Sequence, residues 1–253
     1  MPSEPVTDPA VVRDWLEAAD RVVALVGAGI STDSGIPDFR GPKGLWTLNP
    51  KSERMSDISY YVTDPEVRAL AWQSRLENPA WNAEPNAGHH ALAELERQGR
   101  MAAIITQNID GLQQLAGSDP SNVIEVHGTV REVMCLGCNY QAPMVEALDR
   151  VRAGEIDPRC FECGGILKSA TISFGQNLIP AVIDRAFDEA SSCDLMICIG
   201  STLTVYPVAL LPGAAAAGGA KVVTINGEPT AYDTQADAIL QGDIAKTLTQ
   251  LVG

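Results

Sequence analysis

The sequence predicts an α/β protein built on a doubly wound parallel sheet of the Rossmann-like type, with a smaller second lobe. Two observations lead to this prediction. Short apolar runs bounded by polar turns alternate with helical stretches along most of the chain, which is the pattern of a parallel sheet. Two segments, residues 43–85 and 131–168, interrupt the alternation and indicate insertions. At 253 residues the chain is long enough for a large domain that carries such insertions.

The predicted elements follow in chain order. Asp8-Pro9 is typical of a helix N-cap followed by proline at the first helical position, and the apolar period after it predicts a first helix through Ala19. The apolar run Arg21–Val26 predicts the first strand. Later strands are predicted at Met101–Thr106, Val123–Val126, Thr171–Phe174, Asp194–Ile199 and Lys221–Ile225. Helices are predicted at Gly88–Gln98 and Ala181–Ser191, and a helix end at Ala214–Ala217.

The interruptions divide the chain into three predicted units. Residues 1–42, 86–130 and 169–253 form the Rossmann-like nucleotide-binding domain. Residues 43–85, which are rich in aromatic residues and prolines, form a helical insertion that contains a cofactor loop. Residues 131–168 form an insertion that contains four cysteines. We expect the two insertions to make up the smaller lobe.

Composition and charge restrict the class of protein. A hydrophobic content of 45% with 20% charged residues is ordinary for a globular protein, and no apolar run approaches the length of about 18 residues that a membrane span needs. The acidic, proline-rich start Met1–Asp8 has neither a secretory nor a transit pattern, so we expect a cytoplasmic location. The net charge of −14 argues against a nucleic-acid partner and suits a cationic, lysine-rich protein segment.

Four of the six cysteines have the spacing of a metal site. Cys135-x-x-Cys138 and Cys160-x-x-Cys163 predict two knuckles that together hold one tetrahedral Zn²⁺. Four thiolates leave no open position for water, so the predicted role is structural. Two disulfides, or four unrelated buried thiols, are the alternatives. Cys193 and Cys198 lie at and within an apolar strand and are interpreted as packing residues.

A glycine-rich turn follows the first predicted strand. In Gly27-Ala28-Gly29-Ile30-Ser31 the glycines allow backbone N–H groups to approach a diphosphate. The third glycine of the dehydrogenase fingerprint is missing because Thr32 occupies its position, which argues against hydride transfer. Asp38-Phe39-Arg40 follows shortly afterwards and combines a carboxylate, an aromatic ring and a cation. This combination favours a site that acts on the cofactor itself.

Polar residues also follow four later strands, where ligands bind in doubly wound folds. Gln107–Gly111, Gly200–Thr202 and Asn226–Glu228 are candidate ligand-binding turns, and ordinary Asx turns or βα loops are the alternative for each. His127 ends another strand and is placed for general-base chemistry near neutral pH. The other two histidines, His89-His90, begin a helix and are interpreted as packing or solvent-exposed residues.

Taken together and in this order, the motifs resemble those of the sirtuins, which are NAD-dependent protein lysine deacylases. The motifs that carry the resemblance are Gly27–Ser31, Gly35–Gly41, Thr106–Asp110, His127-Gly128, the two cysteine knuckles, Gly200–Leu203 and Asn226. The match extends over nearly the whole chain. It implies that NAD is consumed rather than reduced. The implied reaction moves an acyl group from protein lysine to the ribose, giving nicotinamide, O-acyl-ADP-ribose and free lysine. The expected acyl group is acetyl.

The resemblance also implies roles for individual residues. His127 is the implied general base, and Asn108 and Asp110 complete the catalytic set. The implied cofactor residues are Gly27, Ala28, Gly29, Ser31, Ile36, Asp38, Phe39, Arg40, Gln107, Asn108, Ile109, Asp110, Gly200, Ser201, Thr202, Asn226, Glu228, Asp243 and Ile244. The implied substrate residues, which hold the acyl-lysine peptide as an extended strand, are Ile172, Phe174, Gly175, Gln176, Leu203 and Val205.

The chain departs from the family pattern in the substrate region. Lys168-Ser169 stands where the family commonly has Arg-Pro, Gln176 replaces a glutamate, and Ser173 replaces an apolar residue. The desuccinylase branch carries a Tyr-x-x-Arg pair, and the corresponding stretch here is aligned as Trp72-Gln73-Ser74-Arg75. Because the tyrosine is missing, we expect preference for a neutral acyl group, acetyl or longer.

Several other functions remain open on the sequence. A deacylase that prefers longer or acidic acyl chains would use the same site. A protein mono-ADP-ribosyltransferase would use the same activated ribose carbon. A non-enzymatic module that senses NAD, and an NAD oxidoreductase, are the remaining alternatives.

Overall fold

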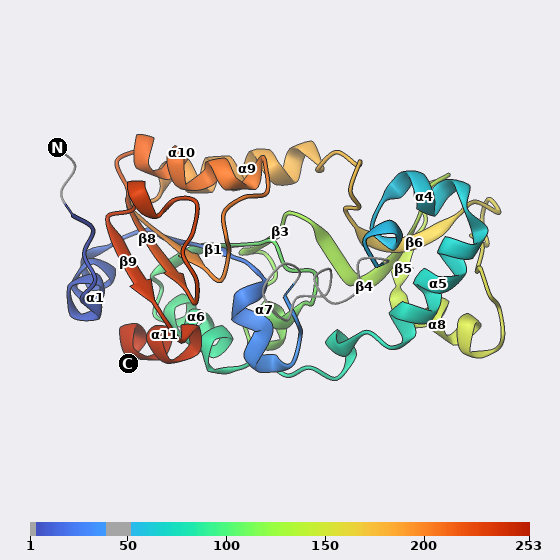
Figure 1. The fold of residues 1–253 in the computed structure, drawn as a ribbon, viewed down its shortest axis with the longest axis horizontal. Helices are drawn as coiled ribbons and strands as arrows, with labels where there is room; N and C mark the ends of the chain where they lie inside the picture. Colours follow the sequence, from blue (N-terminus) through green and yellow to red (C-terminus); the bar gives the residue numbers. More distant parts are fainter. Residues whose placement is uncertain (1–3, 39–51) are drawn as a thin grey trace.

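The first strand, β1 (Val22–Val26), is apolar throughout because it is buried on both faces of a sheet. It lies at the centre of the larger of two lobes in this computed structural model, which describes residues 4–38 and 52–253 (Figure 1). β1 pairs in parallel with β2 (Met101–Thr106) on one side and with β7 (Leu195–Ile199) on the other. The sheet continues through β3 (Val123–Glu125), β8 (Lys221–Asn226) and β9 (Ala238–Gln241).

The six strands follow the order β3-β2-β1-β7-β8-β9, and each neighbouring pair is parallel. The chain therefore moves outward from β1 in one direction and then returns to build the other side, which is the doubly wound arrangement. The predicted fold class is confirmed. The short edge strand β9 has no counterpart among the predicted strands.

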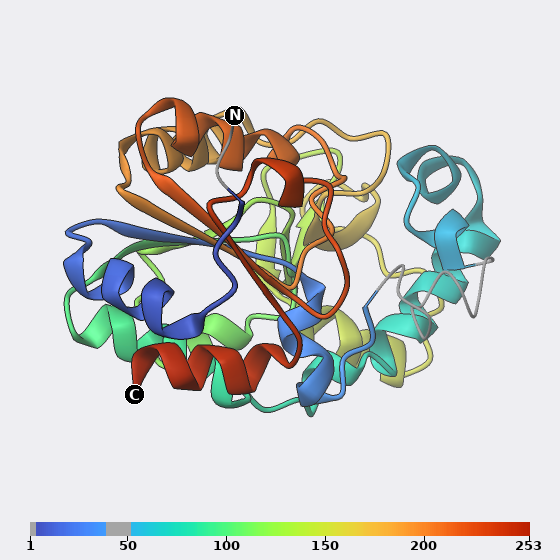
Figure 2. The ribbon, with the colours of Figure 1, turned by 60° about the vertical axis from the view of Figure 1, so that its left-hand side comes forward.

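Helices cover both faces of the sheet (Figure 2). α1 (Pro9–Ala18), α6 (Ala87–Arg97) and α11 (Ile244–Val252) pack on the face to which Val22, Ala24 and Val26 contribute. α9 (Pro180–Ser192) and α10 (Leu211–Ala217) pack on the face of Val23 and Leu25. The Asp8 side chain accepts a hydrogen bond from Ala10 N at 2.9 Å, which confirms the predicted N-cap.

The second lobe combines a small sheet with helices from both insertions (Figure 1). β4 (Gly128–Cys135) pairs antiparallel with β5 (Gln141–Pro143) and with β6 (Leu167–Thr171). The helices are α3 (Ser52–Met55), α4 (Ile58–Thr63), α5 (Pro65–Leu76) and α8 (Met144–Arg152), while α7 (Leu112–Leu115) follows β2. Trp72 of α5 and Leu148 of α8 share one hydrophobic core, so the two insertions form a single lobe.

The strand predicted at Thr171–Phe174 is wrong. Only Thr171 belongs to a strand, and that strand, β6, lies in the small antiparallel sheet. The residues after it take partners at the junction of the lobes: Ile172 N donates to His127 O at 2.8 Å, and Phe174 N donates to Ser56 O at 2.8 Å. An apolar run identifies extended chain, but it does not identify the sheet or junction that supplies its partners.

Among the helices of residues 4–38 and 52–253, none has the length and apolar character that crossing a membrane requires.

Candidate active site

The polar turns after β1, β2, β7 and β8 open onto one cleft with a volume of about 1,320 Å³. Parallel strands bring their carboxyl ends to one edge of the sheet, so turns from distant parts of the chain converge there. The opposite wall comes from α5 and from the segment after β6, so the cleft lies between the lobes. Its volume fits a dinucleotide.

Two glycines of the first turn allow that turn to lie against the turn after β7. A Cβ added at Gly27 would lie 2.7 Å from Gly200 O, and one at Gly29 would lie 2.7 Å from Gly200 Cα. Gly29 N donates to Gly200 O at 2.8 Å, which fixes the contact. The glycines are thus required by the approach of two backbone segments, a reason that the local motif does not reveal.

His127 lies in the cleft wall with its base-competent nitrogen available. Its Nδ1 is 3.0 Å from Gln107 O, and a carbonyl only accepts, so Nδ1 carries the proton and Nε2 presents a lone pair. Burial lowers the pKa of the His127 imidazole, and the hydrogen bond to Gln107 O opposes this lowering only partly. The imidazole is therefore neutral at pH 7 and can accept a proton.

Asn108 is held by a buried polar network behind the cleft. Its Nδ2 is 3.2 Å from Ser31 Oγ and 3.2 Å from Gly27 O. Ser31 Oγ donates to Asp110 Oδ2 at 2.8 Å, and Asp110 Oδ1 accepts from Leu112 N at 2.9 Å. Asn108 lines the cleft, whereas Ser31 and Asp110 are buried and do not. The two buried groups orient the amide from behind.

His89 belongs to the same network, a role that the sequence analysis missed. Asn86 N donates to His89 Nδ1 at 3.3 Å, so Nε2 carries the proton and faces Ser31 Oγ at 3.4 Å. Burial lowers the pKa of His89 to about 4. The burial of His89 agrees with its interpretation as a packing residue, and His90 is exposed as expected. The spacing Asn86-x-x-His89 could have indicated this role. It is that of a capping box, in which the side chain of the histidine accepts a hydrogen bond from the backbone of the N-cap residue.

Most of the cofactor residues implied by the resemblance lie in the cleft wall. Those that line it are Gly27, Ala28, Gly29, Asp38, Gln107, Asn108, Ile109, Gly200, Ser201, Thr202, Asn226, Glu228, Asp243 and Ile244. Ile36 is half-buried outside this lining. Phe39 and Arg40 lie outside the residues that the structure describes. Gln107 Nε2 donates to Ser201 Oγ at 2.8 Å, which links the turns after β2 and β7.

The implied substrate residues form two rims of the cleft. Ile172, Phe174, Gly175 and Gln176 line one rim, and Val205 lines the other. Leu203 packs instead in the core beneath the sheet, where its positive φ of 56° turns the chain.

The small lobe contributes to the cleft wall through α5, and Arg75 of the aligned stretch Trp72–Arg75 lies in that wall. Trp72 is fully buried in the lobe core, and Ala71, Ser74 and Arg75 are the members of α5 that line the cleft. The Arg75 guanidinium donates to Tyr61 Oη at 3.0 Å and lies over the Trp72 ring at 4.5 Å. Arg75 is thus already engaged by aromatic neighbours.

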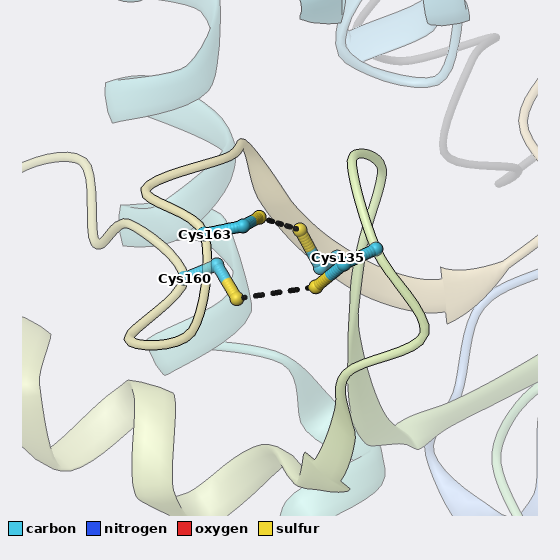
Figure 3. A group of neighbouring side chains, drawn as sticks. Cys135, Cys160 and Cys163 are labelled. Atoms are coloured by element: carbon cyan, nitrogen blue, oxygen red, sulfur yellow. Dashed lines mark hydrogen bonds between the residues drawn. The ribbon is translucent and has the colours of Figure 1, made fainter.

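The four predicted zinc ligands converge in the small lobe, and Figure 3 shows the thiol of Cys163 directed toward Cys135 and the thiol of Cys160 directed into the same cluster. All four Sγ atoms lie within 4.8 Å of one another. The Cys135–Cys163 and Cys138–Cys160 Sγ separations are 3.5 and 3.7 Å, close to the roughly 3.8 Å across a tetrahedral zinc.

Glycines next to the cysteines complete the metal cradle. Gly137 N and Gly165 N point at Cys135 Sγ and Cys163 Sγ at 3.2 and 3.3 Å, and a Cβ at Gly165 would come within 2.9 Å of Cys135 Sγ. These residues fit a structural zinc site. In contrast, Cys193 and Cys198 are buried behind the large sheet, where burial raises the pKa of Cys193 to about 11. Their interpretation as packing residues agrees with this burial.

The protein has an open α/β sheet with a dinucleotide-sized cleft at its carboxyl edge, and a four-cysteine lobe is joined to that sheet. This architecture defines a two-lobed nucleotide-binding protein with a histidine base in the cleft. The model of the Sir2 family matches residues 27–207, and the chain belongs to that family. The resemblance to the sirtuins is confirmed.

Relatives and solved structures agree with this assignment. The NAD-dependent protein deacetylase 2 of Streptomyces coelicolor is 46% identical over 91% of this chain and 96% of its own length. The NAD-dependent protein deacetylase of Sulfolobus acidocaldarius is 41% identical over 95% of this chain and 92% of its own. A Sir2 structure with a deacetylated p53 peptide and 3′-O-acetyl-ADP-ribose superimposes with a TM-score of 0.88 at 34% identity, covering 97% of both chains. A Sir2–p53 peptide–NAD⁺ structure gives 0.86 at 35% identity, also covering 97% of both.

Proposed function

We propose that this chain is an NAD-dependent protein deacetylase. It removes an acetyl group from protein lysine and releases nicotinamide, O-acetyl-ADP-ribose and free lysine. The activity named for the Streptomyces coelicolor and Sulfolobus acidocaldarius relatives supports this reaction. So do the ligands in the Sir2 structures, which include NAD⁺, a p53 peptide and acetyl-ADP-ribose.

The observation that carries the proposal is the arrangement of His127. Its Nδ1 is committed to Gln107 O, its Nε2 is free to accept a proton, and its pKa is lowered by burial. We assign it the role of general base on a ribose hydroxyl, which a neutral imidazole performs near pH 7. A module that only binds NAD would not need a base held in one tautomer.

We propose that NAD binds along the cleft. The turn Gly27–Gly29 and the hydroxyls of Ser201 and Thr202 hold the diphosphate, and Asn226 binds on the adenosine side. When bound, NAD supplies the ribose carbon that loses nicotinamide and accepts the acyl oxygen. Asn108, fixed by Ser31 and Gly27 O, orients the nicotinamide. Pocket walls that exclude water during this exchange prevent hydrolysis of the activated ribose.

We propose that the substrate peptide binds as an extended strand between Gly175-Gln176 and Val205, where the cleft is lined from both sides. Phe174 N and O already pair with Ser56 and Ile58, so the turn after Phe174 offers the peptide its backbone groups. Gln176 shapes that turn, since its Oε1 accepts from Ser173 N at 2.9 Å. Backbone pairing of this kind predicts broad tolerance of peptide sequence.

The preferred acyl group is proposed to be neutral, acetyl or longer. The positive charge of Arg75 is the one feature of α5 that would favour an acidic acyl group, and its guanidinium is engaged by Tyr61 and Trp72. The small side chains Ala71 and Ser74 leave space at the same wall.

Two further proposals concern cellular context. We propose a cytoplasmic location, because all six cysteines are free thiols and four are grouped as metal ligands, which suits a reducing compartment. We also propose that nucleic acid is not a partner, because the net charge of −14 opposes phosphate binding.

Mass spectrometry of the products tests the reaction. The protein is incubated with NAD and matched peptides carrying unmodified, acetyl-, butyryl- or succinyl-lysine. We expect O-acyl-ADP-ribose and free lysine from the acetyl and butyryl peptides, with little from succinyl. ADP-ribose attached to peptide or protein would assign a transferase instead, and reduced nicotinamide would assign an oxidoreductase. A kinetic advantage for succinyl over acetyl would overturn the acyl preference.

A further inference from the structure

Lys168 is a buried cation to which the proposed reaction gives no role. Its side chain is only 1% exposed, and Nζ donates to the backbone carbonyls of Ser169, at 2.9 Å, and Thr171. None of the ion pairs in the described part of the chain includes it. The ammonium group has therefore exchanged water for two carbonyls of its own strand.

The pairing of β4 with β6 explains why those carbonyls need a donor. Gly128 pairs with Thr171 and Val133 with Ser169, so β4 advances five residues while β6 advances two. The additional residues of β4 bulge away from β6 and interrupt the regular ladder between these two pairs. Buried or partly buried carbonyls beside such a bulge require another donor, and Lys168 Nζ supplies it to Ser169 O and Thr171 O.

The same piece of β6 supports His127. Gly128, directly after the histidine, has φ of +72°, and a Cβ there would lie 2.0 Å from Ala170 O. On the other side of this contact, Ile172 N donates to His127 O at 2.8 Å. Residues 169–172 and His127-Gly128 therefore form one tightly packed backbone unit.

We propose that Lys168 is a positioning residue for the reaction: by bonding both carbonyls it fixes residues 169–172, which hold the base His127 and continue into the peptide rim. This inference rests on the proposed deacetylase function. Lys168 is not among the residues that line the cleft, and it acts through the backbone.

The energetic cost of this lysine supports a specific role. Burial, and to a smaller extent the charge of Arg75, lowers the pKa of Lys168 to about 7. A buried cation without a carboxylate partner is costly, and an apolar side chain of similar volume would serve packing at lower cost. An apolar side chain has no donor for the two carbonyls, however. The function of this lysine is therefore expected to lie in the backbone geometry that it imposes.

The test compares Lys168→Met, which keeps the volume but removes the donors, with Lys168→Arg, whose guanidinium can reach two carbonyls. Peptide affinity is measured by fluorescence anisotropy with a labelled acetyl-lysine peptide, and peptide KM, NAD KM and kcat by product mass spectrometry. Lys221→Met, an exposed lysine that stacks on Trp15, is the matched control. All rates are normalised to the folded, zinc-loaded fraction.

For Lys168→Met we expect peptide Kd and KM to rise about tenfold and kcat to fall about tenfold, while NAD KM stays within about twofold. Lys168→Arg should restore all three within about threefold. Unchanged peptide binding in Lys168→Met, or a loss of peptide affinity that Lys168→Arg shares in full, would overturn the proposal. If Lys168→Met does not fold, Lys168→Gln, which keeps one donor group, takes its place with an intermediate effect expected. Absence of turnover in the unmodified protein would instead refute the deacetylase function. The peptide affinities would still test the positioning role of Lys168.

Discussion

The cysteine site and the cleft are assembled in opposite ways. The four thiols come from two knuckles, Cys135–Cys138 at the end of β4 and Cys160–Cys163 before β6, and these two strands are neighbours in one small sheet. The cleft draws its walls from residues as distant as Gly27 and Ile244. A metal site of closely spaced ligands is thus a local property of one lobe. The cleft exists only when both lobes and the whole large sheet are folded, so its residues are vulnerable to distant changes.

The largest effect is expected from a change that destroys the cysteine site. Replacing Cys160 with serine removes one of four ligands, and structural zinc in small domains contributes an apparent binding free energy on the order of 10 kcal/mol. We expect loss of bound zinc and unfolding of the small lobe, while the large sheet stays folded. Elemental analysis measures the zinc, and amide hydrogen exchange compares β4 and β6 with β1 and β7.

Cys193→Ser is the matched control, because Cys193 is buried in the core behind the large sheet. It should retain full zinc content. Equal loss of exchange protection in β1 and in β4 of Cys160→Ser would contradict the independence of the two regions.

A smaller effect is expected from a change at the cleft that spares both lobes. His127→Ala removes the proposed base, and turnover should fall by at least about 100-fold, or roughly 2.7 kcal/mol of activation free energy. Zinc content, thermal unfolding and NAD affinity should be retained, because among residues 4–38 and 52–253 the side chain bonds only to Gln107 O. The exposed His90→Ala serves as control. A loss of less than tenfold with full zinc would remove His127 from the role of base.

The third prediction tests how tightly the cleft depends on long-range packing. Gly29→Ala places a Cβ against the backbone of Gly200, which cannot move aside as a flexible side chain would. We expect a loss of about 2 kcal/mol in unfolding free energy, together with weaker NAD binding. Gly35→Ala is an informative control: its φ of +82° disfavours alanine, but no atom of the described residues lies within 4 Å of its Cβ position. NAD affinity that falls equally in both variants would show that turn strain, and not the contact with Gly200, shapes the cleft.

The same contrast explains how much the sequence could predict. The knuckles, the apolar strands of the parallel sheet and the turns at their ends are encoded within a few residues, so their patterns identified them. The strand predicted at Thr171–Phe174 was wrong because its partners, His127 O and Ser56 O, are far away in sequence. The alignment of Trp72 with the tyrosine of the desuccinylase pair stays a prediction, because the burial of Trp72 in the lobe core does not test it.

The residues of the site that the sequence did not reveal are those whose role depends on contacts with residues distant in sequence. His89 looks like any buried histidine at a helix start until folding brings Ser31 to 3.4 Å. Lys168 was visible as a departure from the family pattern, but its two carbonyl contacts follow from a bulge in β4 that no local pattern predicts. Groups that position others are therefore harder to predict than groups that act directly.

The smallest expected effect concerns the pH dependence contributed by His89. Its pKa is about 4 in the folded chain, against an ordinary value near 6.5 when unfolded, so between these values the unfolded chain binds more protons. Stability contributed by neutral His89 is thus present above about pH 6.5 and is lost as the pH falls toward 4. His89→Gln cannot titrate, so the free-energy advantage of the unmodified protein over this variant should shrink by about 1 kcal/mol between about pH 7 and pH 5.5. Urea unfolding at both pH values measures the difference, and the exposed His90→Gln should show no such change. A pH-independent difference for His89→Gln would mean that His89 is as easily protonated as a surface histidine, and the network behind Asn108 would then lack its neutral donor.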